Sequence, residues 1–115
     1  MYGHETIRRV QQTAFTCRAA VWTLLEPTTT NVSTEGNTTP LSNRVFLEIY
    51  NKGQAATAKL FIYLTQSTTT PTVSVKLCKA IETGAYHMEP VDTGTKVWAR
   101  PAAATARVIV TEYGQ

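Results

Sequence analysis

Charged side chains are scarce in this chain of 115 residues, making up 17% of it against 43% for hydrophobic residues. Such a balance is typical of a folded globular domain and argues against an intrinsically disordered chain. The formal net charge is only +3, and Arg8 and Arg9 are the only adjacent pair among the basic residues. Because a nucleic-acid-binding surface usually needs a dense basic patch, the sequence predicts no nucleic-acid partner.

Long apolar runs are also lacking. No stretch approaches the roughly 18 apolar residues of a membrane span, and residues 1–5 lead into charged residues rather than the apolar segment of a secretion signal. We therefore expect a protein that is neither secreted nor held in a membrane. Cys17 and Cys78 are then expected to be small buried hydrophobic residues rather than disulfide partners.

Catalytic motifs are missing as well. His4 and His87 have no second ligand at metal-binding spacing, and no nucleophile elbow or glycine-rich phosphate loop occurs. We expect His87, which lies near Glu89, to be a strand histidine satisfied by a neighbouring carboxylate. No pair of acidic residues suggests glycoside hydrolysis. The sequence thus predicts no enzyme, no cofactor and no metal site.

Alternation of apolar and polar residues is what the chain has in abundance. A period of two is the pattern of a β-strand, and strands spaced by about ten residues with turn residues between them indicate a sandwich or small barrel. We therefore predict an all-β fold, a single antiparallel β-sandwich that is jelly-roll-like or Ig-like, with an N-terminal extended arm. The predicted strands are residues 14–25 (one strand or a pair), 44–50, 59–64, 73–77, 85–88, 96–100 and 107–112.

The same alternation predicts the core and one local pairing. Turn residues at 51–54 suggest that residues 44–50 and 59–64 form a β-hairpin. The residues expected to share the core are Val45, Leu47, Ile49, Leu60, Ile62, Leu64, Val73, Val75, Val97, Val108 and Val110.

Composition divides the chain into an N-terminal arm, residues 1–12, and a sandwich domain, residues 13–115. The domain includes a long polar loop, residues 28–43, which exceeds the usual length of a connection. The arm has no adjacent turn to fold it back. Two interpretations of it stay open, an untied terminus and an extended segment that pairs with an exposed sheet edge of a neighbouring chain.

Aromatic residues alternate with the predicted core, where a solvated sheet face usually carries polar ones. Aromatic residues and arginine are enriched in the cores of protein interfaces, so we predict that these residues contact another protein. The alternative is that the long loop or the arm of the same chain covers the rings. The predicted interface comprises Tyr2, Ile7, Arg8, Arg9, Phe46, Tyr50, Phe61, Tyr63, Trp98 and Arg100.

Three segments resemble small virion proteins of tailed bacteriophages. They are a strand ending in an Asn-x-Gly turn at residues 43–53, an acidic-Pro turn leading into a strand at 88–100, and a closing strand at 106–112. The likeness is closest to capsid cement, or decoration, proteins. It implies a protein made in the host cytoplasm that binds the major capsid protein, as a homotrimer, on the outer surface of the phage head and stabilises neighbouring capsomers. A receptor- or carbohydrate-binding module of a phage tail or fibre is the alternative.

Overall fold

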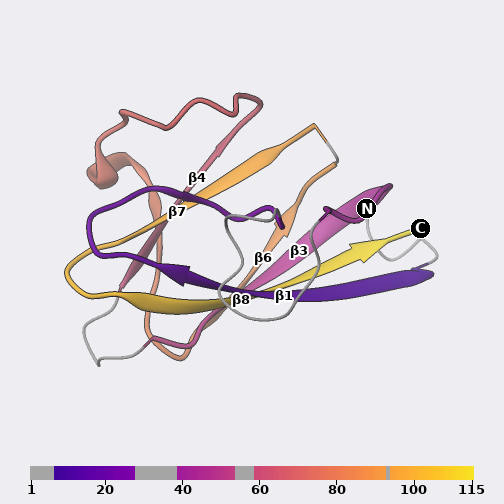
Figure 1. The fold of residues 1–115 in the computed structure, drawn as a ribbon, viewed down its shortest axis with the longest axis horizontal. Helices are drawn as coiled ribbons and strands as arrows, with labels where there is room; N and C mark the ends of the chain where they lie inside the picture. The colour runs from indigo at the N-terminus through magenta and orange to yellow at the C-terminus, as the bar shows by residue number, and fades with distance from the viewer. Residues whose placement is uncertain (1–6, 28–38, 54–58, 93) are drawn as a thin grey trace.

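The computed structural model describes residues 7–27, 39–53, 59–92 and 94–115. Within these ranges, no helix is long and apolar enough to cross a membrane. The elements, drawn in Figure 1, are β1 (Arg9–Cys17), β2 (Thr23–Leu24), β3 (Arg44–Asn51), β4 (Leu60–Thr65), the short 3-10 helix η2 (Val75–Leu77), β5 (Lys79–Ile81), β6 (Tyr86–Pro90), β7 (Lys96–Pro101) and β8 (Ala106–Gly114).

The strands form two antiparallel sheets with the orders β1-β8-β3-β6 and β2-β7-β4-β5 (Figure 1). The pairings are nested along the chain: β1 with β8, β2 with β7, β3 with β6 and β4 with β5. Nesting of this kind places two Greek keys in one double sheet, which is the jelly roll. The predicted antiparallel β-sandwich is therefore confirmed, and of the two variants expected the strand order is that of the jelly roll.

The core lies between the two sheets and is built from alternate residues of the strands. Leu64 is half-buried against it. Val45 is also half-buried, beside an irregularity in the β3–β8 register between Arg44 and Phe46. The other predicted core residues that the structure confirms as buried are Leu47, Ile49, Leu60, Ile62, Val97, Val108 and Val110.

The predicted hairpin between residues 44–50 and 59–64 is wrong, because β3 and β4 lie in different sheets. After β3, the backbone N–H groups of Lys52 and Gly53 both donate to the carbonyl of Arg107, so the chain continues beside β8 instead of turning back. Gly53 has φ +64°, and a Cβ added there would lie 2.5 Å from Cγ2 of Thr83. Lys52 and Gly53 therefore do not turn the chain back along β3, and the next strand, β4, belongs to the other sheet.

The predicted strand at residues 73–77 is also absent. The segment ends in the 3-10 helix η2, at whose start the Ser74 hydroxyl accepts a hydrogen bond from the Lys76 N–H at 3.3 Å. A 3-10 helix has three residues per turn, so every second side chain no longer points the same way. Val73 and Val75 are only half-buried, and Leu77 is 83% exposed. These two valines are thus not part of the core, and β5 begins only at Lys79.

The described part of the predicted arm is a strand of the domain. Residues 9–12 form the first half of β1, whose register with β8 runs without a break from Arg9 opposite Gly114 to Cys17 opposite Ala106. The N–H of Arg8 donates to the carbonyl of Gly114 at 2.9 Å and extends the pairing by one residue. Tyr2 lies outside the described residues. From Arg8 to Cys17, the chain pairs with its own last strand.

The two cysteines are free thiols in different surroundings. Cys17, at the end of β1, is fully buried, and burial raises the pKa of its thiol to about 12 despite a hydrogen bond with Thr23 that lowers it. Cys78 is half-buried, and partial burial also raises its pKa. The prediction of small buried residues therefore holds for Cys17 and only in part for Cys78.

Thiol titration should separate the two cysteines. At about pH 8 we expect an aromatic disulfide reagent to react with Cys78 in the native protein and with both thiols in denaturant, because only the thiolate reacts and the Cys17 thiolate is suppressed. The Cys78→Ser variant is the control and should show no native-state reaction. Equally fast reaction of both thiols in the native protein would contradict the burial of Cys17.

A candidate protein-binding face

The outer face of the β1-β8-β3-β6 sheet carries apolar side chains on all four strands. Because Leu47 and Ile49 of β3 point into the core, the alternate residues Phe46, Glu48 and Tyr50 point outward. The register places further apolar residues beside them on β8, β6 and β1. We call this surface the aromatic face; it comprises Val10, Phe46, Tyr50, Tyr86, Met88, Pro90, Ile109 and Tyr113, arranged around Glu48.

The aromatic face contains two stacked ring pairs. The rings of Phe46 and Tyr113 stack with centroids 4.5 Å apart and 21° between their planes. Those of Tyr50 and Tyr86 stack at 4.4 Å and 19°. Tyr86 is nevertheless 63% exposed, with Val10 60% and Met88 47% exposed on the same face. Contiguous exposed apolar side chains of this size mark interaction surfaces more often than scattered ones do.

Basic residues lie at the two ends of the aromatic face. Arg8 precedes β1 at one end. At the other end, Arg107 lies on β8 beside Thr16 of β1, and its carbonyl accepts the backbone N–H of Lys52. Arg18 is exposed just beyond β1 at this end. The face thus has a cationic border and a largely uncharged interior.

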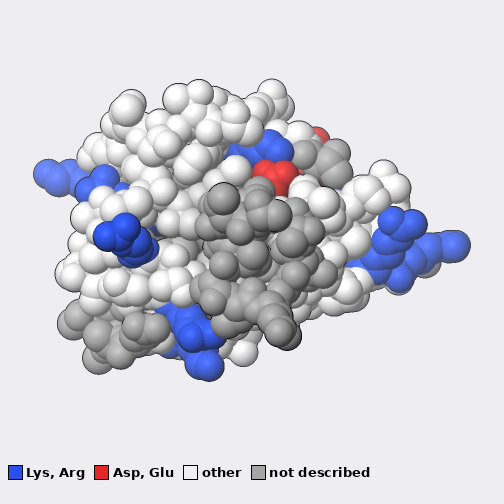
Figure 2. Space-filling view, in the orientation of Figure 1, with Lys and Arg blue, Asp and Glu red and all other residues white. Residues whose placement is uncertain are grey.

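Burial of acidic residues leaves the described surface more cationic than the net charge suggests. Glu26, Glu89 and Glu112 are buried, and each forms an ion pair with a basic residue. On the side of the molecule drawn in Figure 2, basic side chains stand in separate groups, one of them beside the little acidic surface that is visible. The exposed basic residues are therefore dispersed and do not merge into one dense patch.

The other predicted aromatic residues lie on the outer face of the second sheet, which the chain itself partly covers. Trp98 is 6% exposed, and its indole N–H donates to the carbonyl of Ser67 at 3.4 Å. The ring of Tyr63 lies 6.3 Å from that of Trp22, which is also buried. The expected exposure of Trp98 is corrected: it is buried, and its printed partner Ser67 belongs neither to the long loop nor to the arm of the alternative interpretation. Phe61, like Tyr63 and Arg100, is half-buried on this face.

The predicted interface residues are consequently divided between two sheets. Phe46 and Tyr50 belong to the aromatic face, whereas Phe61, Tyr63, Trp98 and Arg100 lie on the second sheet. Ile7, Arg8 and Arg9 are exposed at the start of β1. The division follows from the absence of the expected hairpin, since β3 and β4 would have shared a face only as neighbours in one sheet.

Sequence reasoning missed Tyr86, Met88 and Tyr113 as members of the face. The signal was present in β6, where Tyr86 and Met88 alternate with His87 and Glu89. The structure turns the apolar pair outward and the polar pair toward the other sheet, the reverse of the usual order.

The inward polar residues of β6 contact each other and a lysine of the second sheet. Glu89 contacts Nε2 of His87 and, at 3.2 Å, Nζ of Lys79 on β5. The prediction that a neighbouring carboxylate satisfies His87 is thus confirmed, and the Lys79 contact joins the edges of the two sheets. Among the described residues, no group of three or more His, Cys, Asp or Glu side chains is placed to hold a metal ion.

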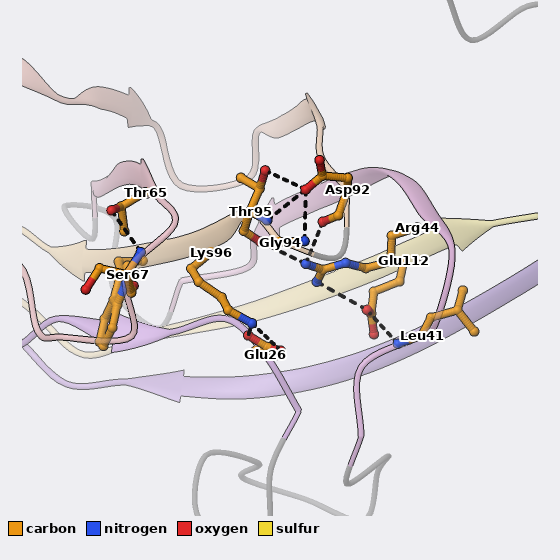
Figure 3. Close-up of polar contacts among 11 residues, drawn as sticks. Glu26, Leu41, Arg44, Thr65, Ser67, Asp92, Gly94, Thr95, Lys96 and Glu112 are labelled. Carbon is orange, nitrogen blue, oxygen red and sulfur yellow. Dashed lines mark hydrogen bonds and ion pairs between the residues drawn. The ribbon is translucent and has the colours of Figure 1, made fainter.

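A buried polar network closes one end of the sandwich (Figure 3). The guanidinium of Arg44 contacts Oε2 of Glu112 at 3.5 Å and donates to the carbonyls of Asp92 and Thr95 at 3.0 and 2.9 Å. Glu112 also accepts from Nε2 of Gln11 at 2.9 Å and from the backbone N–H of Leu41 at 3.0 Å. The network therefore ties β1, β3 and β8 to two connecting segments.

The turn that receives Arg44 is itself organised by Asp92. Its Oδ1 accepts hydrogen bonds from the Thr95 hydroxyl at 3.0 Å and from the backbone N–H groups of Thr95 and Gly94, both at 2.9 Å. These bonds lower the pKa of the Asp92 carboxyl, and the bond from the Thr95 hydroxyl has the largest effect. The turn therefore presents the carbonyls of Asp92 and Thr95 to Arg44.

No family model, curated protein or solved structure matches the chain.

Proposed function

We propose that this protein is a non-catalytic structural protein that docks through its aromatic face on an acidic protein surface. The observation that carries the proposal is the exposure of Val10, Tyr86 and Met88 beside two stacked ring pairs on one sheet face. Aromatic residues, methionine and arginine are the residue types enriched at protein interfaces. Rings that are already held in place lose little conformational freedom on binding, which favours affinity.

The charge of the partner surface follows from the border of the face. Arg8, Arg18, Lys52 and Arg107 lie at its ends, whereas Glu48 is its only carboxylate among the described residues. Complementary charge steers association and selects among partners. A partner with acidic groups around its contact area therefore fits this face better than a second copy presenting the same basic border.

We further propose that the partner is the major capsid protein and that the docked protein, as a homotrimer, stabilises the outer surface of a phage head. The resemblance to cement proteins supports this, because one of the three similar segments contains β3, another covers most of β8, and the third begins within β6. These strands carry most of the aromatic face. The jelly roll is also a fold of viral capsid and lectin domains. A protein that binds the assembled shell but not its free subunits stabilises the shell by mass action.

Adding the protein to purified heads that lack it should raise the temperature at which the heads release their DNA. The Tyr86→Ser variant should bind heads about tenfold or more weakly, as expected for loss of a large exposed aromatic contact. Head binding is measured by co-sedimentation, and disruption by dye access to the packaged DNA. The mass of protein bound per head at saturation tests whether it binds as a trimer.

Leu77→Ser is the matched control, since Leu77 is 83% exposed but lies on η2, outside the aromatic face. This variant should protect heads as well as the original protein does. Equal binding by both variants would remove the aromatic face from the interaction. If heads are not protected and labelled protein is found on the tail or fibres, the cement function fails and the receptor- or carbohydrate-binding alternative replaces it.

A further inference from the structure

A single carboxylate occupies the middle of the aromatic face. Glu48 lies on β3 directly opposite Met88 of β6 and Thr111 of β8. Two positions away along β3 in each direction are Phe46 and Tyr50, which are about 7 Å from it given the rise of a strand. Both belong to the stacked ring pairs described above, so Glu48 stands between two pairs of aromatic rings.

Glu48 also differs from the other acidic residues that the structure describes, because its carboxylate lacks a described partner. Its side chain is half-buried, yet the carboxylate has no hydrogen bond or ion pair with any described residue. The outward-facing Lys52 is distant, since it lies one residue beyond the end of β3 and four residues from Glu48, about 13 Å away. By contrast, a basic side chain or a donor N–H contacts each of the other described carboxylates, which are Glu26, Glu82, Glu89, Asp92 and Glu112.

Covering this face would make the isolated charge costly. A surface that docks on the aromatic rings removes water from Glu48, and an unpaired carboxylate taken out of water is strongly unfavourable. A stable complex therefore requires a cationic group of the partner at this point. Arginine suits it better than lysine, because a planar guanidinium can bind a carboxylate with two hydrogen bonds while stacking on aromatic rings.

We propose that Glu48 is the specificity residue of the aromatic face and binds an arginine side chain of the partner protein between the two ring pairs. The inference rests on the proposed docking through this face and adds the chemistry at its centre. The partner surface then has an arginine in the middle and acidic groups around it, the reverse of the charge pattern on this chain.

A small arginine probe tests the site without the partner. Titrating the ¹⁵N-labelled protein with N-acetylarginine methylamide should shift the amide signals of Glu48, Met88 and Thr111 in a saturable way. The Glu48→Gln variant should bind the probe about tenfold or more weakly, as expected when a charge-assisted hydrogen bond is lost. N-acetylnorleucine methylamide, which has an uncharged side chain, should leave these signals in place.

Glu82→Gln is the control variant, because Glu82 is exposed and already pairs with Lys59 at 3.5 Å. It should bind the arginine probe as the original protein does. Glu48→Gln should keep the unfolding midpoint of the original protein, since it removes no internal contact. Equal binding of the probe by Glu48→Gln, or shifts centred on Glu82, would overturn the assignment.

Head binding separates this inference from the proposed function. If Tyr86→Ser weakens binding to heads while Glu48→Gln does not, docking through the face stands and the arginine site is overturned. If the arginine probe binds at Glu48 and neither variant alters head binding, the arginine site stands and the head is not its partner.

Discussion

Replacing Arg44 by methionine should lower the free energy of unfolding by about 3–5 kcal/mol, because it leaves a buried carboxylate without its cation. The side chains of Arg44 and Glu112 are only 2% and 1% exposed, so water cannot take the place of either. The change also removes the donors to the carbonyls of Asp92 and Thr95, which loosens the turn between β6 and β7. Denaturant unfolding at neutral pH measures the loss.

An exposed ion pair is the control for this experiment. Lys59 and Glu82 lie at a similar distance, 3.5 Å, but their side chains are 43% and 71% exposed. Lys59→Met should therefore cost only about 0–1 kcal/mol. The double variant Arg44→Met/Glu112→Leu should recover part of the loss, since no charge is then stranded. Equal losses for Arg44→Met and Lys59→Met would show that the buried network does not form.

Deleting residues 1–12 should destabilise the sandwich rather than only its assembly. The deletion removes Arg9 to Gln12, which pair with Thr111 to Gly114 of β8, and it leaves Glu112 without the amide of Gln11. Several lost backbone hydrogen bonds and one disturbed buried carboxylate amount to roughly 3–6 kcal/mol, a large part of the stability of a small domain. Circular dichroism during denaturant unfolding measures the effect.

Val10→Thr in the full-length chain is the control for the deletion. It removes an exposed apolar side chain but keeps the β1–β8 pairing and a β-branched residue, so stability should change by about 0.5 kcal/mol or less. A truncated protein that unfolds at the original midpoint would contradict the pairing of residues 9–12 within the chain. It would return these residues to the interpretation of an arm that contacts a neighbour.

The sequence predicted correctly the strands that bury only one face. Residues 44–50, 96–100 and 107–112 fall within β3, β7 and β8, because each buries every second residue against the other sheet. Pairing was harder to predict, since turn residues at 51–54 favour a hairpin equally well whether the next strand returns or crosses to the other sheet. In a jelly roll the partner of a strand is often remote, as β8 is for β1.

The candidate site was predicted only in part, because the pairing of the strands was not predicted. Phe46 and Tyr50 were predicted as outward-facing because they alternate with Leu47 and Ile49. Tyr86 was not assigned to the same face, because that assignment requires the pairing of β6 with β3. Buried charges were the other limit. Nothing local shows that Glu112 is buried, because its burial depends on Arg44, Gln11 and Leu41, which lie 68 to 101 residues earlier in the chain.

The position of β8 between β1 and β3 determines when a newly synthesised chain can complete its fold. β8 is the last of these strands to be synthesised. Until then, β1 and β3 lack the strand that pairs with both of them. Pairing between remote strands forms slowly, and unpaired strand edges meanwhile favour association with other nascent chains. We therefore expect the yield of folded protein in the cell to depend on how fast β8 inserts, and on chaperones that shield β1 and β3 until it does.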